Sequence, residues 1–400
     1  MEGTSDKGSH FNCKSKRRLI HYFASFTFLN LLPTMSGFHF ARFAPSSLAT
    51  QASIWFTGIC LLGSLSAVGQ SVKATSVSAS APGKTVVRKI DGKILGADIS
   101  FLPQLEDRGI KFQDKGVQKD AIEILKDHGF NYVRLRIFNN PAADSGYSPK
   151  RGFCDLEHTK QMAARAKKAG MKLLLDFHYS DTWADPQKQF KPSAWANLSG
   201  AQLNQAIHDY TRDVLLALKA QGTTPDMVQV GNEINHGMIW PDGDVQQADS
   251  LVKFDALADL LKAGVSAVHE VAPKTLVMLH IALGGQNLHS VTWLDRIRAR
   301  NVPFDVIGES YYPKWHGTIP ELRNNLTDLA KRYPQDVVVV EYSERKAEVN
   351  DAAFSLPNNK GKGTFIWEPL NTWEAIFDKQ GKSNERILVY DEISKKYKIK

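Results

Sequence analysis

Cysteine is scarce in this sequence, with three residues in 400. Cys13 and Cys60 lie in an N-terminal leader, so the rest of the chain keeps one thiol, Cys154, and cannot form an internal disulfide. A large apolar core does not need such cross-links, so their absence does not argue against an extracellular protein. We therefore expect packing, rather than disulfides, to stabilise the fold.

The common metal-site motifs are also missing. The sequence has no HExxH, no paired CxxC and no EF-hand loop. No glycine-rich phosphate loop follows the first strand-like segment, where the residues read GADISFLPQLED. We expect neither a metal nor a cofactor.

No basic run occurs outside the leader. Lys+Arg number 50 against 42 Asp+Glu, a net charge of +8, and half of it comes from residues 1–69, where six basic residues oppose two acidic ones. The remaining charge is spread along the chain, which is weak support for a nucleic-acid partner. We expect no nucleic acid to bind.

A long, clean hydrophobic run is absent as well. The leader, residues 1–69, contains two shorter apolar stretches, Leu19–Leu32 after the basic cluster Lys14–Arg18, and Ile54–Val68. A positive start, a short apolar centre and small residues beyond it are typical of an export signal, and Met35 is a possible true start. An uncleaved anchor is the alternative, but the run is shorter than the roughly 20 apolar residues a span needs. We expect a secreted or periplasmic protein without stable membrane association after signal removal, and a flexible linker at residues 70–84.

The remaining residues, 85–400, have a globular composition, with 42% hydrophobic and 23% charged residues in the whole chain. Short apolar runs alternate with longer amphipathic stretches, and the runs are apolar throughout, as strands buried on both faces must be. The expected strands are Ile94–Ile99, Tyr132–Phe138, Met171–His178, Met227–Gly231, Leu276–Ile281, Val306–Tyr311, Val337–Tyr342 and Gly363–Trp367. The expected helices include Val117–His128, Leu156–Ala169, Ala201–Ala220, Leu251–Val271, Ile319–Arg332 and Asn384–Lys398.

Eight such units predict a single α/β domain, a closed (β/α)8 TIM barrel that follows the export signal and linker. A doubly wound open sheet is the alternative, which the missing phosphate loop disfavours.

The expected strands turn polar at their carboxyl ends, where such barrels carry their chemistry. Glu233 ends the fourth strand and Glu341 the seventh, so the two should face each other across the mouth of the barrel. Two carboxyls about 5–5.5 Å apart are typical of a retaining glycosidase, one as nucleophile and one as general acid/base. Either glutamate alone could be a solvated residue at a strand end, but the pair beside Asn232 favours catalysis.

Other strand-end residues are candidates for substrate binding. Arg136 could pair with Glu341 and keep it ionised, or form a structural ion pair elsewhere. Tyr311 or Tyr312 could donate a hydrogen bond to the nucleophile, or either could pack against a helix. The tryptophans Trp183, Trp240, Trp367 and Trp373 lie at strand ends and loops, where aromatic faces stack on sugar rings. The full set of candidates is Asp98, Arg136, Asp176, His178, Asp181, Trp183, Asn232, Trp240, His280, Tyr311, Tyr312 and Trp367.

Several of these segments, in order, resemble glycoside hydrolase family 53, the arabinogalactan endo-β-1,4-galactanases. They are DFHYSDTWADP, GNEI followed by GMIWP, SYYP, VVVVE and FIWEP, and the resemblance runs from about Gly96 to Pro369. It implies that Glu233 is the general acid/base and Glu341 the nucleophile. It also implies that Asn232 holds a sugar 2-hydroxyl, and that Arg136 and Tyr311 position the nucleophile.

By the same resemblance, the galactan cleft would be lined by His178, Asp181, Trp183, Trp240 and Trp367. The sequence departs from the family after the fifth strand, where His280-Ile-Ala-Leu-Gly-Gly-Gln286 replaces the usual His-Leu-Asp. The segment between Glu341 and Trp367 is also short, which removes a place where other members carry insertions.

From these features we expect a secreted, retaining endo-β-1,4-galactanase that cuts the galactan side chains of pectin, acting as a monomer on a polysaccharide. The alternatives are a related endo-β-1,4-glycanase acting on mannan or cellulose, and a barrel that binds galactan without cutting it.

Overall fold

The computed structural model describes residues 87–246, 251–372 and 374–399. The expected leader at residues 1–69, its export signal and possible start at Met35, the linker at residues 70–84 and the candidate Trp373 lie outside these residues. Among the helices of the described part, none has the length and apolar character needed to cross a membrane.

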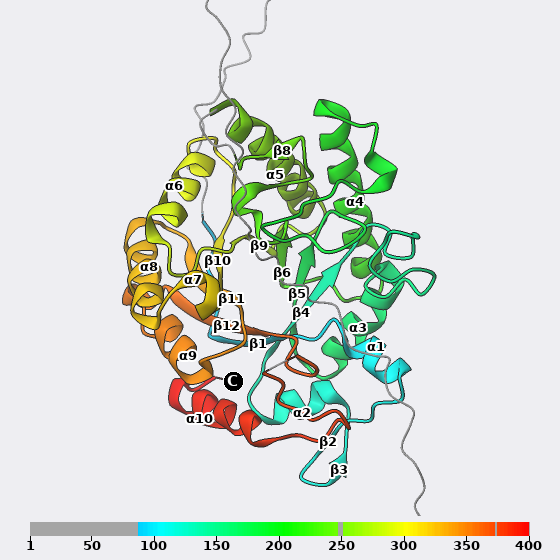
Figure 1. Ribbon diagram of the computed structural model, residues 1–400, viewed down its shortest axis with the longest axis vertical. Helices are drawn as coiled ribbons and strands as arrows, with labels where there is room; N and C mark the ends of the chain where they lie inside the picture. Colours follow the sequence, from blue (N-terminus) through cyan, green and yellow to red (C-terminus); the bar gives the residue numbers. More distant parts are fainter. Residues whose placement is uncertain (1–86, 247–250, 373, 400) are drawn as a thin grey trace, which may run out of the picture. The chain divides into compact units, whose positions relative to one another are not determined.

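Eight parallel strands close into a barrel, and helices surround it (Figure 1). Around the ring the order is β1, β4, β5, β6, β9, β10, β11 and β12, and β12 pairs with β1 to close the circle. The strands are β1 (Ile94–Asp98), β4 (Tyr132–Ile137), β5 (Lys172–Phe177), β6 (Met227–Val230), β9 (Leu276–Ile281), β10 (Val306–Tyr311), β11 (Asp336–Tyr342) and β12 (Gly361–Trp367). The predicted (β/α)8 fold is confirmed, and the open-sheet alternative is wrong.

The surrounding helices lie outside the barrel, where α1 to α9 fall between successive barrel strands and α10 follows the last one. They are α1 (Leu102–Asp107), α2 (Ala121–Asp127), α3 (Leu156–Lys168), α4 (Gly200–Ala220), α5 (Leu251–Val271), α6 (Asn287–Arg298), α7 (Pro313–His316), α8 (Ile319–Arg332), α9 (Lys346–Phe354) and α10 (Leu388–Tyr397). Two hairpins lie in the loops, β2 (Gln113–Asp114) with β3 (Val117–Gln118), and β7 (Gly237–Met238) with β8 (Gly243–Asp244).

The expected helix Val117–His128 begins later than its pattern predicts. Val117 belongs to the exposed strand β3, and α2 begins only after Asp120, whose side chain accepts a hydrogen bond from the backbone N–H of Ile122. The cap supplies an acceptor for a helix N–H that has no partner within the helix, and so sets the first turn.

The inside of the barrel is a tightly packed apolar layer. Phe365 of β12 lies against Tyr132 of β4, with ring centroids 5.7 Å apart, and over Gly96 of β1. A Cβ at Gly96 would lie 2.1 Å from the Phe365 ring, so glycine is required for this approach. The barrel is therefore a filled core, and the chemistry must lie at one of its ends.

Carboxylates hold the amino-terminal ends of the strands, which we call the floor. Asp226 accepts from the backbone N–H of Leu173 at 3.0 Å, and Asp305 accepts from that of Val277 at 2.9 Å. Asp305 also forms an ion pair with Arg88 (2.5 Å), whose backbone N–H donates to the same carboxylate. Both acids satisfy main-chain donors at strand starts, and Asp305, which is buried, also holds the segment before β1 against the barrel.

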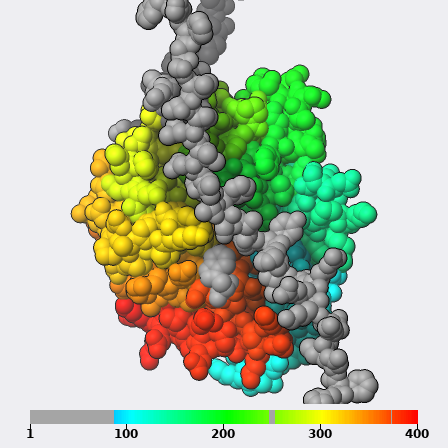
Figure 2. Space-filling model, viewed as in Figure 1, coloured from blue at the N-terminus to red at the C-terminus, as the bar shows by residue number. Residues whose placement is uncertain are grey.

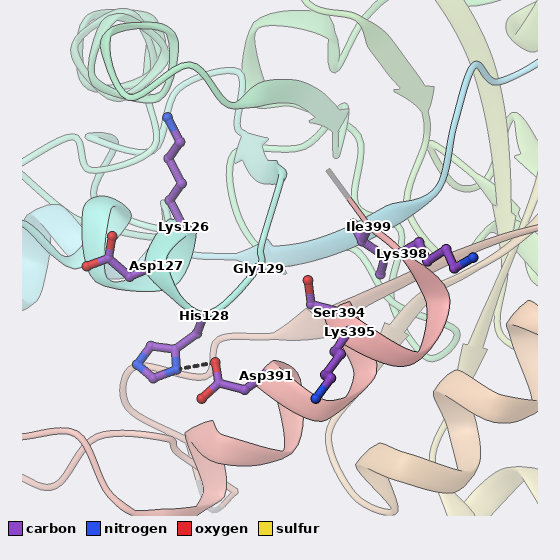
Figure 3. A pocket seen from close by; sticks show the side chains of 9 residues that line it. All are labelled: Lys126, Asp127, His128, Gly129, Asp391, Ser394, Lys395, Lys398 and Ile399. Carbon is purple, nitrogen blue, oxygen red and sulfur yellow. Dashed lines mark hydrogen bonds and ion pairs between the residues drawn. The ribbon is translucent and has the colours of Figure 1, made fainter.

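The C-terminal helix α10 packs against the turn between α2 and β4, also on the floor side. His128 Nδ1 and Asp391 Oδ1 lie 2.8 Å apart, and a Cβ at Gly129 would come within 2.3 Å of Ser394 (Figure 3). The space-filling view shows the C-terminal residues, in red, close to the cyan residues near position 120 (Figure 2). An open hollow at this contact is lined by Lys126, Asp127, His128, Gly129, Asp391, Ser394, Lys395, Lys398 and Ile399. Its lysines lie at helix C-termini, where cations offset the partial negative charge of the helix end.

Candidate active site

Two glutamates meet at the carboxyl ends of the strands, which we call the mouth. Glu233 follows β6 and Glu341 belongs to β11, and β9 and β10 lie between these strands in the ring. One carboxylate oxygen of each residue lies within 4.8 Å of one oxygen of the other. Both side chains are largely buried, at 8% exposure each. Residues far apart in the sequence therefore form a close pair of carboxyls.

The backbone at Glu233 is held in an unusual conformation. Its φ of 49° and ψ of 51° lie in the left-handed region, two residues after Gly231 with φ 84°. Tyr179 after β5 and Glu368 after β12 also have positive φ, at 48° and 43°. Such residues cost on the order of 1 kcal/mol each and occur where the surrounding structure imposes a functional geometry. Positive φ values therefore occur at three strand ends of the mouth.

Glu233 is surrounded by buried hydrogen-bonding groups. Its Oε1 accepts from Ser310 Oγ at 2.7 Å, and its backbone N–H donates to His280 Nδ1 at 3.4 Å. Burial and the neighbouring Glu341 carboxylate raise the pKa of Glu233 well above its usual range, against the effect of the Ser310 hydrogen bond. Glu233 is thus suited to carry a proton near neutral pH.

Glu341 has a cation and a phenol as partners. Arg134 Nη1 donates to its Oε2 at 2.9 Å, and the Tyr312 hydroxyl donates to its Oε1 at 2.8 Å. Burial raises the pKa of Glu341 too, while Arg134 and Tyr312 act in the opposite direction. Of the two carboxyls, Glu341 therefore has the environment that favours the ionised form.

The arginine beside Glu341 is Arg134 and not Arg136, contrary to the prediction. Arg134 also donates to Asp98 (3.0 Å), Asp176 (2.8 Å) and Asn232 (2.8 Å), which aim it across the barrel. Arg136, two residues further along β4, pairs with Glu368 and lies 4.5 Å from the ring centroids of both Phe101 and Trp183. This stacking holds Arg136 towards β1 and β12, away from Glu341.

The tyrosine beside Glu341 is Tyr312, so the assignment of Tyr311 by resemblance is wrong for this contact. The Tyr311 hydroxyl donates to the backbone oxygen of Gly317, outside the barrel. Successive residues of an extended chain point to opposite sides, which places Tyr312 on the inside. Of the two tyrosines that the sequence left open, Tyr312 is the one that donates to Glu341.

The sequence profile described as glycosyl hydrolase family 53 matches residues 94–353. The chain belongs to glycosyl hydrolase family 53.

Individual relatives agree with this family. An uncharacterized protein of Niallia circulans is 46% identical over 256 residues, covering 63% of this chain and 68% of that protein. An arabinogalactan endo-β-1,4-galactanase of Cellvibrio japonicus is 38% identical over 279 residues, covering 67% and 70%. The solved catalytic domain of a family 53 glycoside hydrolase from Ignisphaera aggregans superposes with a TM-score of 0.68 at 33% identity, covering 77% of this chain and 99% of that one.

Three candidate substrate-binding residues of this family 53 chain are buried and have partners within the protein, so sugar binding by them stays a prediction. Asp98 is 1% exposed, and Asp176 and His280 are fully buried. The two aspartates bind Arg134, and His280 bonds to Ser310. These contacts hold Arg134 and Ser310, which in turn bind the two glutamates.

His178 and Asp181 also have internal partners. His178 is 3% exposed, and its ring contacts Asp176 and accepts from the backbone N–H of Ala184. Asp181 accepts from the backbone N–H of Asn140 and from the N–H and hydroxyl of Ser193. Both residues hold the loops after β4 and β5 in place.

An aromatic wall lies at the mouth of the barrel, formed by Phe101, Trp183 and Trp367, and two of its rings pack on Arg136. Its ring centroids lie 6.1 to 6.4 Å apart, and each ring is partly exposed. Sugar binding by Trp183, Trp240, Trp367 and Asn232 stays a prediction. Phe101 was not among the predicted residues, although it follows Asp98 in the polar segment after the first strand, which was a usable signal.

The donor chemistry of the mouth does not suit a metal. Among the described residues, Glu233, His280 and Glu341 come close enough to share an ion. Both His280 nitrogens already have hydrogen-bond partners, however, and the Arg134 guanidinium binds Glu341. Cys154 is equally unsuited to chemistry, because burial raises the pKa of its thiol to about 12.

Proposed function

We propose that this family 53 hydrolase is a retaining endo-β-1,4-galactanase, exported from the cell, that cuts the galactan side chains of pectin. The observation that carries the proposal is the pair of buried carboxyls, Glu233 and Glu341, with oxygens within 4.8 Å of each other. Inverting enzymes need about 6.5–9.5 Å between the carboxyls to place a water, whereas retaining enzymes need about 5–5.5 Å.

The two environments assign the roles. Glu341, paired with Arg134, attacks the anomeric carbon, and the bond from that carbon to the leaving oxygen breaks. Glu233, whose pKa burial and Glu341 raise, gives its proton to that oxygen. Once the sugar is esterified on Glu341, Glu233 as a carboxylate takes a proton from water, which attacks the anomeric carbon and releases Glu341.

The substrate is inferred from relatives and from the aromatic wall. The Cellvibrio japonicus protein is named an arabinogalactan endo-β-1,4-galactanase, and this chain covers 70% of its length. The partly exposed rings of Phe101, Trp183 and Trp367 offer apolar faces on which sugar rings stack. Export rests on the signal-like leader, and a monomer is the simplest state because one chain supplies both carboxyls.

Product analysis tests the substrate. Purified residues 70–400 should release short galacto-oligosaccharides from β-1,4-galactan and leave mannan and cellulose intact. Cleavage of mannan with intact galactan would overturn the substrate, and galactan binding without new reducing ends would indicate a binding protein. Secretion of the full chain from its host, or its retention on the membrane, decides the localisation.

Azide rescue tests the roles. Glu233→Ala should lose galactan hydrolysis but keep turnover of an activated aryl galactoside, and azide should then give a β-galactosyl azide. Glu341→Ala should give an α-azide. The reverse pattern would exchange the two assignments.

A further inference from the structure

We infer that His280 and Ser310 form a hydrogen-bonded pair that reserves one oxygen of Glu233 as an acceptor and directs the catalytic proton to the other. The inference rests on the proposed role of Glu233 as general acid/base. Ser310 and His280 are fully buried and act through Glu233, so they are positioning residues.

The three groups form an unbroken chain beneath the mouth. His280 Nε2 lies 2.7 Å from Ser310 Oγ, and Ser310 Oγ lies 2.7 Å from Glu233 Oε1. His280 and Ser310 are fully buried, on the adjacent strands β9 and β10. Water therefore has no access to replace either partner.

The direction of these hydrogen bonds follows from the contacts of the other His280 ring nitrogen, Nδ1. The backbone N–H of Glu233 donates to His280 Nδ1, and Gln229 Nε2 lies 3.1 Å from the same atom. Asn232 Oδ1 also lies 3.0 Å from Nδ1, but it already accepts from Arg134. A proton on Nδ1 would leave the buried N–H of Glu233 without its acceptor, which is the costlier alternative.

The ring proton therefore belongs on Nε2, and His280 donates to Ser310. Burial and nearby Arg134 lower the pKa of His280 well below its usual range, so the imidazole stays neutral with one proton. Ser310 Oγ therefore accepts a hydrogen bond from His280 Nε2–H. Its own single hydrogen is donated to Glu233 Oε1. An oxygen that already accepts a hydrogen bond is the poorer site for a proton, so the acid proton is carried by Oε2.

Loss of the Ser310 hydroxyl should shift the pH dependence of kcat/KM in one direction. The Ser310 hydrogen bond favours the carboxylate form and lowers the pKa of Glu233. The alkaline limb of kcat/KM reports the acid of the free enzyme, so removing the hydroxyl should move that limb to higher pH. The charged groups that face Glu233 are Glu341, Asp185 and Arg134, and those around His280 are Arg134, Asp176, His178 and His316. None of these changes in the variants below.

The kinetic test compares Ser310→Ala with Ser310→Thr. The alanine variant should shift the alkaline limb upward by about one pH unit, the effect of a hydrogen bond to a charged group. Threonine keeps a hydroxyl and should keep the wild-type limb. His280→Ala should shift the limb in the same direction, and His280→Gln, which keeps a donor near Nε2, should shift it less. A limb that Ser310→Ala does not move, or that both Ser310 variants move equally, would overturn the inference.

The second test needs no activity. Nitrogen-15 NMR of histidine-labelled wild-type protein should show His280 with a proton on Nε2 and none on Nδ1, the signal being assigned by its loss in His280→Gln. A proton on Nδ1 refutes the inference even if the enzyme cuts galactan. An inactive wild-type protein with the Nε2 tautomer would instead refute the proposed function and leave the hydrogen-bonded pair standing.

Discussion

The mouth and the floor of the barrel use the same kind of residue in opposite ways. At the floor, Asp226 and Asp305 accept hydrogen bonds from main-chain N–H groups, and Asp305 also has Arg88. At the mouth, Glu233 and Glu341 are buried against each other, and burial raises the pKa of both. Carboxylates matched to main-chain donors stabilise the fold, whereas carboxyls buried as a close pair are left with the proton affinity that catalysis needs.

The largest expected effect lies at the mouth. Glu341→Gln should lower kcat on galactan by on the order of 10⁴-fold, because it removes the nucleophile without changing its shape. The midpoint of urea unfolding should not fall, because the variant removes a carboxylate that is costly to bury while Arg134 keeps Asp98 and Asp176. Kinetics and urea titration of one preparation check both parts. Activity within tenfold of wild type would place the chemistry elsewhere.

The matching change at the floor should have the reverse outcome. Asp305→Ala removes the acceptor of two backbone N–H groups and the partner of Arg88. The free energy of unfolding should fall by about 3 kcal/mol, since buried donors lose their acceptor. The kcat of the folded fraction should stay within twofold of wild type. Asp305→Asn, which keeps an oxygen acceptor, is the control and should lose less stability.

Glu309 is a buried glutamate outside the catalytic pair, so it shows the effect of burial alone. It precedes Ser310 but points outward, accepting from Ser290 Oγ and the backbone N–H of Leu283, and burial raises its pKa to about 8. A raised folded-state pKa gives stability that is complete below the unfolded pKa of about 4.3 and is lost as pH rises through 8.

The variant Glu309→Gln should lack this pH dependence. Between pH 5 and 8, wild type should lose on the order of 3–5 kcal/mol more unfolding free energy than the glutamine variant. Urea unfolding across this range measures the difference. Parallel pH profiles for the two proteins would show that Glu309 stays ionised and has a partner for its charge.

The smallest effect is expected where α10 meets the α2–β4 turn. Asp391 is 44% exposed at its side chain, so its contact with His128 is partly screened. Asp391→Ala should lower the free energy of unfolding by less than about 1 kcal/mol and leave galactan hydrolysis unchanged. Asp391→Asn, which keeps an acceptor for His128, is the matched control. A loss of unfolding free energy comparable with that of Asp305→Ala would mean that this exposed contact stabilises the fold as much as the Asp305 contacts at the floor.

The barrel was predictable because its signals are local. Strands buried on both faces are apolar along their whole length, and Leu276–Ile281 and Val306–Tyr311 match β9 and β10 at both ends. Helix starts that depend on a cap were less visible, as at Asp120. The meeting of Glu233 and Glu341 was also predictable, because closing eight strands brings the ends of the fourth and seventh together.

The partners of these glutamates were not predictable. Arg134 and Arg136 both point inward from β4, and nothing in their spacing says which one reaches Glu341. That choice depends on Phe101 and Trp183, which stack on Arg136 from other strand ends. His280 was predicted to bind the substrate, and its hydrogen bond to Ser310 becomes visible only once β9 and β10 lie side by side.

The amino-acid sequence by itself determined the apolar strands, the order of the units and the acidic residues at the strand ends, because periodicity and polarity act within a few residues along the chain. Only the tertiary structure decided which cation, phenol and hydroxyl meet each carboxyl. Those contacts join residues as far apart as Arg134 and Glu341, and they depend on ring closure and side-chain packing, which no local pattern encodes.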